Sequence, residues 1–263
     1  MRVLELFSGT GSVGKVAKEL NWEVISLDLK NADINIDILN WNYKIYPVGH
    51  FDIIWASPPC DTFSKLRNTW IGRKLKKHGD TIITKEILEN DMMEEGLPIL
   101  NKTKEIINYF NPSYWFIENP QSGRMKEFNN DLPFYDVDYC KYGFDYKKRT
   151  RIWTNVKNFI PKKCCNDCDA IIVIKNIDGT HPKKDKDGNK HIIKSATRTL
   201  HLNNCGGNVE KLNAVKNAVK NKNIIKHKKD VSKDFGGGTN RDMRYRIPPL
   251  LIEELFECIL KDI

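Results

Sequence analysis

The first half of this 263-residue chain alternates short apolar runs with longer amphipathic segments. The apolar runs predict strands over residues 3–6, 23–27, 51–56 and 113–118. The amphipathic segments predict a helix over residues 12–20 and another over residues 85–110, with a break at Gly96-Leu97-Pro98. Because strands and helices alternate in this way, we expect an α/β fold with a mostly parallel sheet and helices on both faces.

The second half of the chain has a less regular pattern. Residues 135–140 and 149–154 alternate apolar and polar positions, which predicts two further strands. A region rich in Lys, Asn, Asp and Gly follows, with a predicted helix over residues 209–219. Apolar residues at helical spacing predict a last helix over residues 248–263. The predicted parts of the chain are residues 1–154, 155–238 and 239–263.

Candidate functional side chains fall at or just past the ends of the predicted strands. These residues are Glu5, Phe7, Asp28, Cys60 and Glu118. In open α/β sheets, ligands bind outside the carboxyl ends of the parallel strands. Their convergence at that edge predicts an enzyme.

Cys60 follows two prolines in the run Ser57-Pro58-Pro59-Cys60. Proline fixes its own φ and restricts the residue before it, so the turn limits the directions that the Cys60 side chain can take. A thiol held in this way at a strand end is well placed to act as a nucleophile. The alternative is a small buried apolar cysteine in a strand-end turn.

The segment Gly9-Thr10-Gly11-Ser12-Val13-Gly14 has the GxGxxG pattern between a predicted strand and a predicted helix. Such a loop binds either a dinucleotide pyrophosphate or S-adenosylmethionine. The nearby Glu5 carboxylate would repel a pyrophosphate but attract the ammonium and sulfonium groups of S-adenosylmethionine, which favours the latter over NAD. Asp28 would then accept hydrogen bonds from the ribose hydroxyls. Phe7 would pack on the adenine, or else be a core aromatic residue.

The amino-acid composition favours a polyanionic partner and a reducing compartment for this protein. The chain has 43 Lys and Arg against 34 Asp and Glu, a formal charge of +9, which suits nucleic acid. The sequence has no apolar stretch long enough for a membrane span, and its first residues resemble a strand rather than a secretion signal. Seven cysteines, an odd number, favour an intracellular protein that is not secreted.

Four segments in this order give the chain a specific resemblance to the cytosine-C5 DNA methyltransferases. They are Glu5-Leu6-Phe7-Ser8-Gly9-Thr10-Gly11, Ser57-Pro58-Pro59-Cys60, Phe116-Ile117-Glu118-Asn119 and Arg149-Thr150-Arg151. The chain is similar to the compact members from phages and large DNA viruses. The resemblance implies a Rossmann-like S-adenosylmethionine-dependent methyltransferase sheet in residues 1–154, a small basic target-recognition region in 155–238, and a C-terminal helix in 239–263 that returns to the catalytic domain.

The resemblance also implies a mechanism. Cys60 would add as a thiolate to C6 of a cytosine flipped out of the duplex, and Glu118 would hold N3 and the exocyclic amine. Arg149 and Arg151 match the paired arginines of the family, one near the base O2 and the other more structural. Taken alone, the Glu118 segment could be a strand-end turn, and the arginines could be solvated or bind phosphate.

S-Adenosyl-L-methionine is the cofactor that the resemblance implies. Its expected site is made of Glu5, Phe7, Ser8, Gly9, Thr10, Gly11, Ser12, Asp28, Leu29, Asp37, Ile38 and Pro58. The chain departs from the family pattern in three places. Pro120 stands where valine is usual, Lys147 replaces a glutamine, and the usual Gly-Asn near the C-terminus is not evident.

Cysteines in the basic region predict a structural zinc site. Cys164 and Cys168 have a spacing that tetrahedral sites use, and Cys205 lies downstream. The alternative is a set of free thiols in a loop. The expected substrate is double-stranded DNA and the expected state is a monomer without a membrane partner. Two other functions remain open: the same reaction on RNA, especially tRNA, and a catalytically inactive homologue that binds nucleic acid.

Overall fold

The computed structural model describes residues 1–144, 146–165, 171–173, 191–193 and 245–262. Two compact units divide the chain, one made of Met1–Asp136, Arg149–Pro161 and Ile252–Ile263, the other of Val137–Lys148 and Lys162–Leu251. The predicted helix over residues 209–219 and most of the predicted recognition region lie outside the described residues. None of the described helices has the length and apolar character that a bilayer crossing requires.

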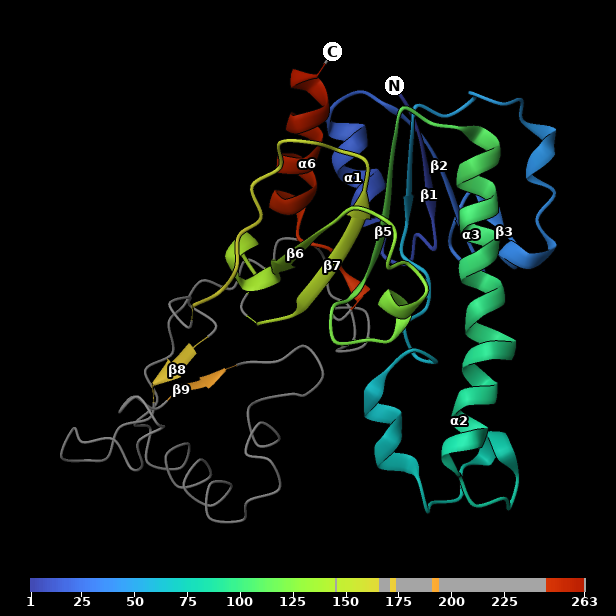
Figure 1. Ribbon diagram of the computed structural model, residues 1–263. Coiled ribbons are helices and arrows are strands. Elements are labelled where there is room, and N and C mark those ends of the chain that lie inside the picture. The colour runs from blue at the N-terminus through green and yellow to red at the C-terminus, as the bar shows by residue number, and fades with distance from the viewer. Residues whose placement is uncertain (145, 166–170, 174–190, 194–244, 263) are drawn as a thin grey trace. The chain divides into compact units, whose positions relative to one another are not determined.

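A seven-stranded sheet with the order β3-β2-β1-β4-β5-β7-β6 forms the centre of the first unit (Figure 1). Its strands are β1 (Arg2–Leu6), β2 (Glu23–Asp28), β3 (Ile34–Asn35), β4 (Ile53–Ala56), β5 (Tyr114–Pro120), β6 (Phe134–Asp138) and β7 (Arg149–Thr154). The pairs from β3 through β5 are parallel, and β5 pairs with β7 in the antiparallel sense. The predicted mostly parallel sheet is confirmed. A separate antiparallel pair joins β8 (Ile171–Val173) to β9 (His191–Ile193).

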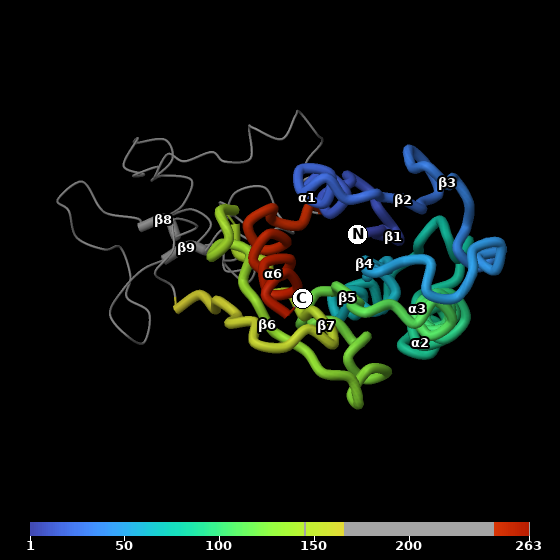
Figure 2. The backbone as a smooth tube through the Cα atoms, turned by 90° about the horizontal axis from the view of Figure 1, so that it is seen from above, coloured from blue at the N-terminus to red at the C-terminus, as the bar shows by residue number. Residues whose placement is uncertain are grey.

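Helices cover both faces of the sheet, as the alternating pattern predicts (Figure 2). On one face, Leu6, Ile54 and Ile117 share a buried apolar cluster with residues of α3 (Leu97–Phe110) such as Phe110. On the other face lie α1 (Ser12–Glu19) and α6 (Pro249–Lys261). There, Phe256 of α6 lies 6.4 Å from both the Trp55 and the Phe116 ring centroids. Helix α6 therefore packs on the sheet through Phe256.

The helix over residues 85–110 does not break where the sequence predicts. It runs from α2 (Lys85–Asp91) through a π-helical turn, η5 (Met92–Gly96), directly into α3. Pro98 falls in the first turn of α3, where its missing N–H group does not interrupt the helix. The predicted break was wrong, because the helix continues through the π turn and past Gly96-Leu97-Pro98.

Short 3-10 helices fill the connections. They are η1 (Ile38–Asn40), η2 (Tyr43–Ile45), η3 (Lys65–Trp70), η4 (Lys76–His78), η6 (Met125–Glu127) and η7 (Tyr139–Tyr142). Two of them, η3 and η4, lie between Cys60 and α2.

Candidate active site

The carboxyl ends of the parallel strands bring the predicted reactive residues to one edge of the sheet. Leu6 of β1 pairs with Leu27 on one side and with Ala56 on the other, and Ala56 pairs with Ile117. The residues that follow these four positions therefore share one level of the sheet, and they include Phe7 and Glu118. This edge is where open α/β sheets bind ligands.

A buried hydrogen bond joins the Pro-Pro-Cys turn to the end of β5. The Nδ2 group of Asn119 donates to the carbonyl oxygen of Pro58 at 2.9 Å. Glu118, the preceding residue, is buried, whereas the Cys60 thiol is half-buried. The nucleophile turn and the Glu118 strand end are thus tied together in the same unit, and Cys60 is not the fully buried core cysteine that was the alternative.

The glycine loop after β1 has an unusual backbone conformation. Phe7, Gly9 and Gly11 all have positive φ angles, of 58°, 51° and 66°. A bulky residue such as Phe7 rarely adopts this left-handed conformation, and such strain gathers at binding sites. A Cβ built on Gly11 would meet no atom within 4 Å, so the outer side of the loop has room for a ligand.

Asp28 holds the glycine loop from the end of β2. Its Oδ2 accepts a hydrogen bond from the Gly9 amide at 2.8 Å, and its Oδ1 accepts one from the Leu29 amide at 2.7 Å. Each carboxylate oxygen can accept a further bond, so a ribose hydroxyl remains compatible with this arrangement. Leu29 itself is exposed beside Asp28.

The Glu5 carboxylate is bound to the backbone at the start of α1, and its expected contact with the cofactor stays a prediction. Its Oε1 accepts from the Val13 amide at 3.1 Å and its Oε2 from the Gly14 amide at 2.9 Å. Burial raises the pKa of Glu5 to about 7, and these two backbone hydrogen bonds oppose that rise. Both carboxylate oxygens therefore serve the first turn of α1, because its amides have no partner inside the helix.

The position of Glu5 explains why the third glycine of the GxGxxG pattern, Gly14, has no side chain. A Cβ at Gly14 would lie 2.7 Å from Oε2 of Glu5 and 3.2 Å from Cγ1 of Val24. Only glycine allows the carboxylate to reach the backbone at this point.

Of the other residues expected around the cofactor, some make polar contacts and others have buried side chains. Asp37 is half-buried and caps η1, with its Oδ1 accepting from the Leu39 amide at 2.9 Å. Thr10 and Ser12 share a hydrogen bond of 2.9 Å between their hydroxyls at the mouth of the loop. The side chains of Ser8 and Pro58 are buried, and Ile38 belongs to the apolar core, so its side chain packs within the protein.

The paired arginines of β7 have different surroundings. The Arg151 guanidinium donates to both carboxylate oxygens of Asp136, at 2.7 and 2.8 Å, and lies 3.6 Å from the centroid of the Phe134 ring. Arg149 is exposed, and its carbonyl oxygen accepts from the Gln121 amide at 3.1 Å. Sequence reasoning missed Asp136, although its position two residues from Phe134 on an alternating strand was a usable signal.

The structure describes only one of the three cysteines of the predicted zinc site. Cys164 is buried beside Cys140, and its amide donates to Oδ2 of Asp138 at 2.8 Å. Cys168 and Cys205 lie outside the described residues. Within the described part of the chain, no three or more His, Cys, Asp or Glu residues are grouped to hold a metal. The zinc site stays a prediction.

Comparisons with known proteins place the chain beside a viral relative. The chain is 37% identical over 264 residues to the "Probable DNA (cytosine-5)-methyltransferase" of Frog virus 3 (isolate Goorha), covering 98% of this chain and 99% of the relative. No protein-family model matches the sequence.

One solved structure supports the fold class, and a second has a lower likeness. A protein assigned as a DNA modification methyltransferase and encoded within an E. coli prophage matches with a TM-score of 0.50 at 13% identity, covering 99% of each chain. The Entamoeba histolytica methyltransferase EhMeth matches with a TM-score of 0.44 at 13% identity, over 100% of this chain and 98% of that one.

Proposed function

The chain belongs to the DNA (cytosine-5)-methyltransferase family, and from this premise we propose that it transfers a methyl group to C5 of cytosine in double-stranded DNA. The observation that carries the proposal is the 2.9 Å hydrogen bond from Asn119 to Pro58. It holds the turn that presents the Cys60 thiol against the strand end that presents the Glu118 carboxyl group. Both lie at the sheet edge that also carries the glycine loop.

S-Adenosylmethionine fits the residues of the glycine loop. The open space outside Gly11 would admit the methionine part. Asp28 would accept from the ribose hydroxyls and Phe7 would pack on the adenine, while Asp37 would accept from the adenine amine. When bound, S-adenosylmethionine supplies the electrophilic methyl group. Glu5 would act indirectly, by holding the loop in shape through Val13 and Gly14.

Cys60 is proposed as the nucleophile. Its thiolate forms a bond from sulfur to C6 of the cytosine, and the electrons of the C5–C6 double bond move into the ring toward N3. C5 becomes nucleophilic and would form the new bond to the methyl carbon, while the electrons of the methyl–sulfonium bond would stay on the sulfur of the donor. The proton on C5 then leaves to a base, the sulfur–carbon bond breaks, and the ring double bond and the Cys60 thiolate are restored.

Glu118 is proposed to stabilise the charge that this addition places on the ring. Its buried carboxyl group would hydrogen bond to N3 and to the exocyclic amine, which also selects cytosine over thymine. The cytosine must leave the base stack to reach Cys60, so the duplex is expected to flip this base.

The two arginines are proposed to have separate roles. Arg151, already paired with Asp136 of β6, would hold β7 in place beside β6, and Arg149 would reach the base O2 or a nearby phosphate. The positive charge of the chain would favour DNA binding in general. An intracellular location, a monomeric state and the structural zinc site remain predictions.

A methyl-transfer assay with two substrates tests this function. Duplex DNA and tRNA are incubated with a labelled methyl donor, and duplex DNA containing 5-fluorocytosine is used to trap the covalent adduct. We expect label in DNA and an adduct that disappears in Cys60→Ala but persists in Cys258→Ala, which removes a half-buried cysteine of α6. Label in tRNA alone would give the RNA function. An absence of label and adduct with either nucleic acid would leave an inactive binding protein.

A further inference from the structure

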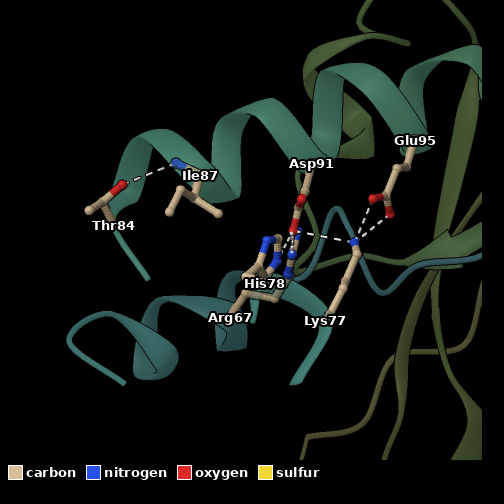
Figure 3. A network of polar contacts seen from close by, with 7 residues as sticks. All are labelled: Arg67, Lys77, His78, Thr84, Ile87, Asp91 and Glu95. Carbon is tan, nitrogen blue, oxygen red and sulfur yellow. Dashed lines mark hydrogen bonds and ion pairs between the residues drawn. The ribbon is translucent and has the colours of Figure 1, made fainter. Parts of the chain in front are cut away.

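The segment that follows Cys60 is anchored to the long helix by a buried ion pair. Arg67 of η3 donates from Nη2 to Oδ2 of Asp91, the last residue of α2 (Figure 3). The two side chains are only 6% and 9% exposed. A buried charge pair is costly to form without good geometry, and breaking it leaves an uncompensated charge. The pair therefore fixes η3 on α2 and is not a solvent-exposed surface ion pair.

Asp91 is the centre of a larger polar cluster. His78 Nε2 lies 3.2 Å from Asp91 Oδ2, and Lys77 Nζ lies 3.5 Å from the same atom and 2.6 Å from Oε1 of Glu95. Burial opposes ionisation of Asp91, but the hydrogen bond from Arg67 and the nearby positive charges lower its pKa below the usual value. Figure 3 shows these side chains converging on Asp91 from the segment beneath the helix.

A second anchor lies at the other end of the π turn. A Cβ on Gly96 would collide with Oγ1 of Thr62 and would lie 3.0 and 3.1 Å from two ring carbons of Phe63. Thr62 and Phe63 come two and three residues after Cys60. The carbonyl oxygen of Phe63 also accepts from the Arg124 amide at 2.9 Å, and Arg124 in turn pairs with Glu89 of α2. The chain just past Cys60 is thus packed against the last residue of the π turn.

Both anchors belong to one local distortion of the helix. The π turn Met92–Gly96 starts directly after Asp91 and ends at Gly96. A π turn widens the helix by one residue and is frequent at functional sites. Here it presents Asp91 toward Arg67 and brings the backbone of Gly96 against Thr62.

We propose that this π turn and Asp91 are a positioning element for Cys60, holding the residues after the nucleophile at Thr62 and at Arg67 so that the thiol keeps its direction toward the base. The inference rests on the proposed function of Cys60. None of these residues contacts the reacting atoms in this proposal. They act through the backbone that carries the sulfur.

Four variants test the Gly96 anchor. Gly96→Ala adds the colliding methyl group, Thr62→Ala with Gly96→Ala removes the hydroxyl that it meets, Thr62→Ala alone is the reference, and Met93→Ala is the control at an exposed position of the same turn. We expect Gly96→Ala to slow single-turnover methyl transfer about tenfold or more, with dissociation constants for DNA and methyl donor within about twofold. The double variant should return to within about threefold of Thr62→Ala. A Gly96→Ala chain that folds only together with Thr62→Ala supports the same contact.

Asp91→Asn, with Glu94→Gln as an exposed control in the same turn, tests the other anchor by the same measurements. A second readout is the rate at which iodoacetamide alkylates Cys60, followed by mass spectrometry of the peptide. We expect alkylation in Asp91→Asn and Gly96→Ala to be at least about threefold faster than in their controls, because the half-buried thiol loses its support. If the wild-type protein methylates no nucleic acid, the proposed function fails, but the alkylation comparison still decides whether Cys60 is positioned from here. Folded variants with the transfer and alkylation rates of their controls overturn the inference.

Discussion

The side-chain amide of Asn119 donates to the carbonyl oxygen of Pro58, 61 residues earlier in the chain. The bond is buried, and it links the residue after Glu118 to a residue two before Cys60. A hydrogen bond of this kind both stabilises the fold and sets the distance between two groups that must act on one base. It can therefore be tested through stability and through catalysis.

Asn119→Asp should damage catalysis more than the fold. The substitution places a carboxylate oxygen against the Pro58 carbonyl oxygen, so the donor is lost and two acceptors face each other. We expect a loss of about 1–3 kcal/mol in the free energy of unfolding, measured by urea denaturation. Single-turnover methyl transfer should fall by about tenfold or more. Asn129→Ala, at another buried asparagine, is the control and should leave the transfer rate unchanged. Equal rates in the two variants would contradict the coupling.

Glu118→Gln should lower the rate of adduct formation with 5-fluorocytosine DNA. Gln can still accept at one oxygen, but it cannot give a proton to N3, so the charge that Cys60 addition creates is less stabilised. We expect a decrease of about 10²–10⁴-fold, with the affinity for the methyl donor unchanged. The measurement is rapid-quench analysis of the adduct. Asp61→Asn, an exposed carboxylate beside Cys60, serves as the control and should stay near the wild-type rate.

Gly14→Ala should weaken binding of the methyl donor. Its Cβ would meet Oε2 of Glu5 at 2.7 Å, so either the carboxylate or the glycine loop must move. We expect a loss of about 1–3 kcal/mol in stability and a rise of about tenfold or more in the dissociation constant for S-adenosylmethionine, measured by calorimetry. Glu19→Ala, at an exposed position at the far end of the same helix, should change neither quantity appreciably. Wild-type affinity in Gly14→Ala would show that the loop shape does not depend on Glu5.

The stability of the protein should fall with rising pH because of Glu5. Burial raises the pKa of this carboxyl group from 4.5 to about 7, so the folded state holds the proton more tightly than the unfolded state does. The resulting stabilisation is complete below the unfolded pKa and is lost as the pH rises through the folded pKa. Between about pH 5 and pH 8, the wild type should lose on the order of 2–3 kcal/mol relative to Glu5→Gln. Urea denaturation of both proteins across this range measures the difference. Parallel pH profiles for the two proteins would refute the prediction.

Arg151→Lys and Arg149→Ala should separate stability from activity. Lys cannot make the two parallel hydrogen bonds that Arg151 makes to Asp136, so we expect a loss of about 1–2 kcal/mol in the free energy of unfolding. Arg149 is exposed, and its removal should change stability by less than about 0.5 kcal/mol. Methyl transfer to DNA should instead fall clearly in Arg149→Ala. The opposite pattern would exchange the roles of the two arginines.

Much of the sheet could be predicted because its strands are short apolar runs that end in polar residues. The runs before Phe7, Asp28, Cys60 and Glu118 all became parallel strands whose ends converge. Two-residue β3 was missed, since so short a strand carries little periodicity.

The parts that escaped prediction depend on contacts between distant segments. Gly96 and Pro98 are helix breakers by local propensity. The π turn is explained by the packing of Thr62 and Phe63 against the helix, which the local sequence does not show. The hydrogen bonds of Glu5 to the start of α1 were also not predicted, because the sequence shows only that Glu5 lies near the loop. Its direction toward Gly14 is a property of the folded strand.

The packing of Phe256 on Trp55 and Phe116 has a consequence for how the protein is made. These aromatic partners are synthesised early, and their cover in α6 emerges from the ribosome only after the whole region between β7 and α6. Until then one apolar side of the nascent sheet stays in contact with water and is open to aggregation. A chain interrupted by premature termination before Pro249 would keep that surface uncovered, making it a substrate for chaperones and proteases rather than a partly working enzyme.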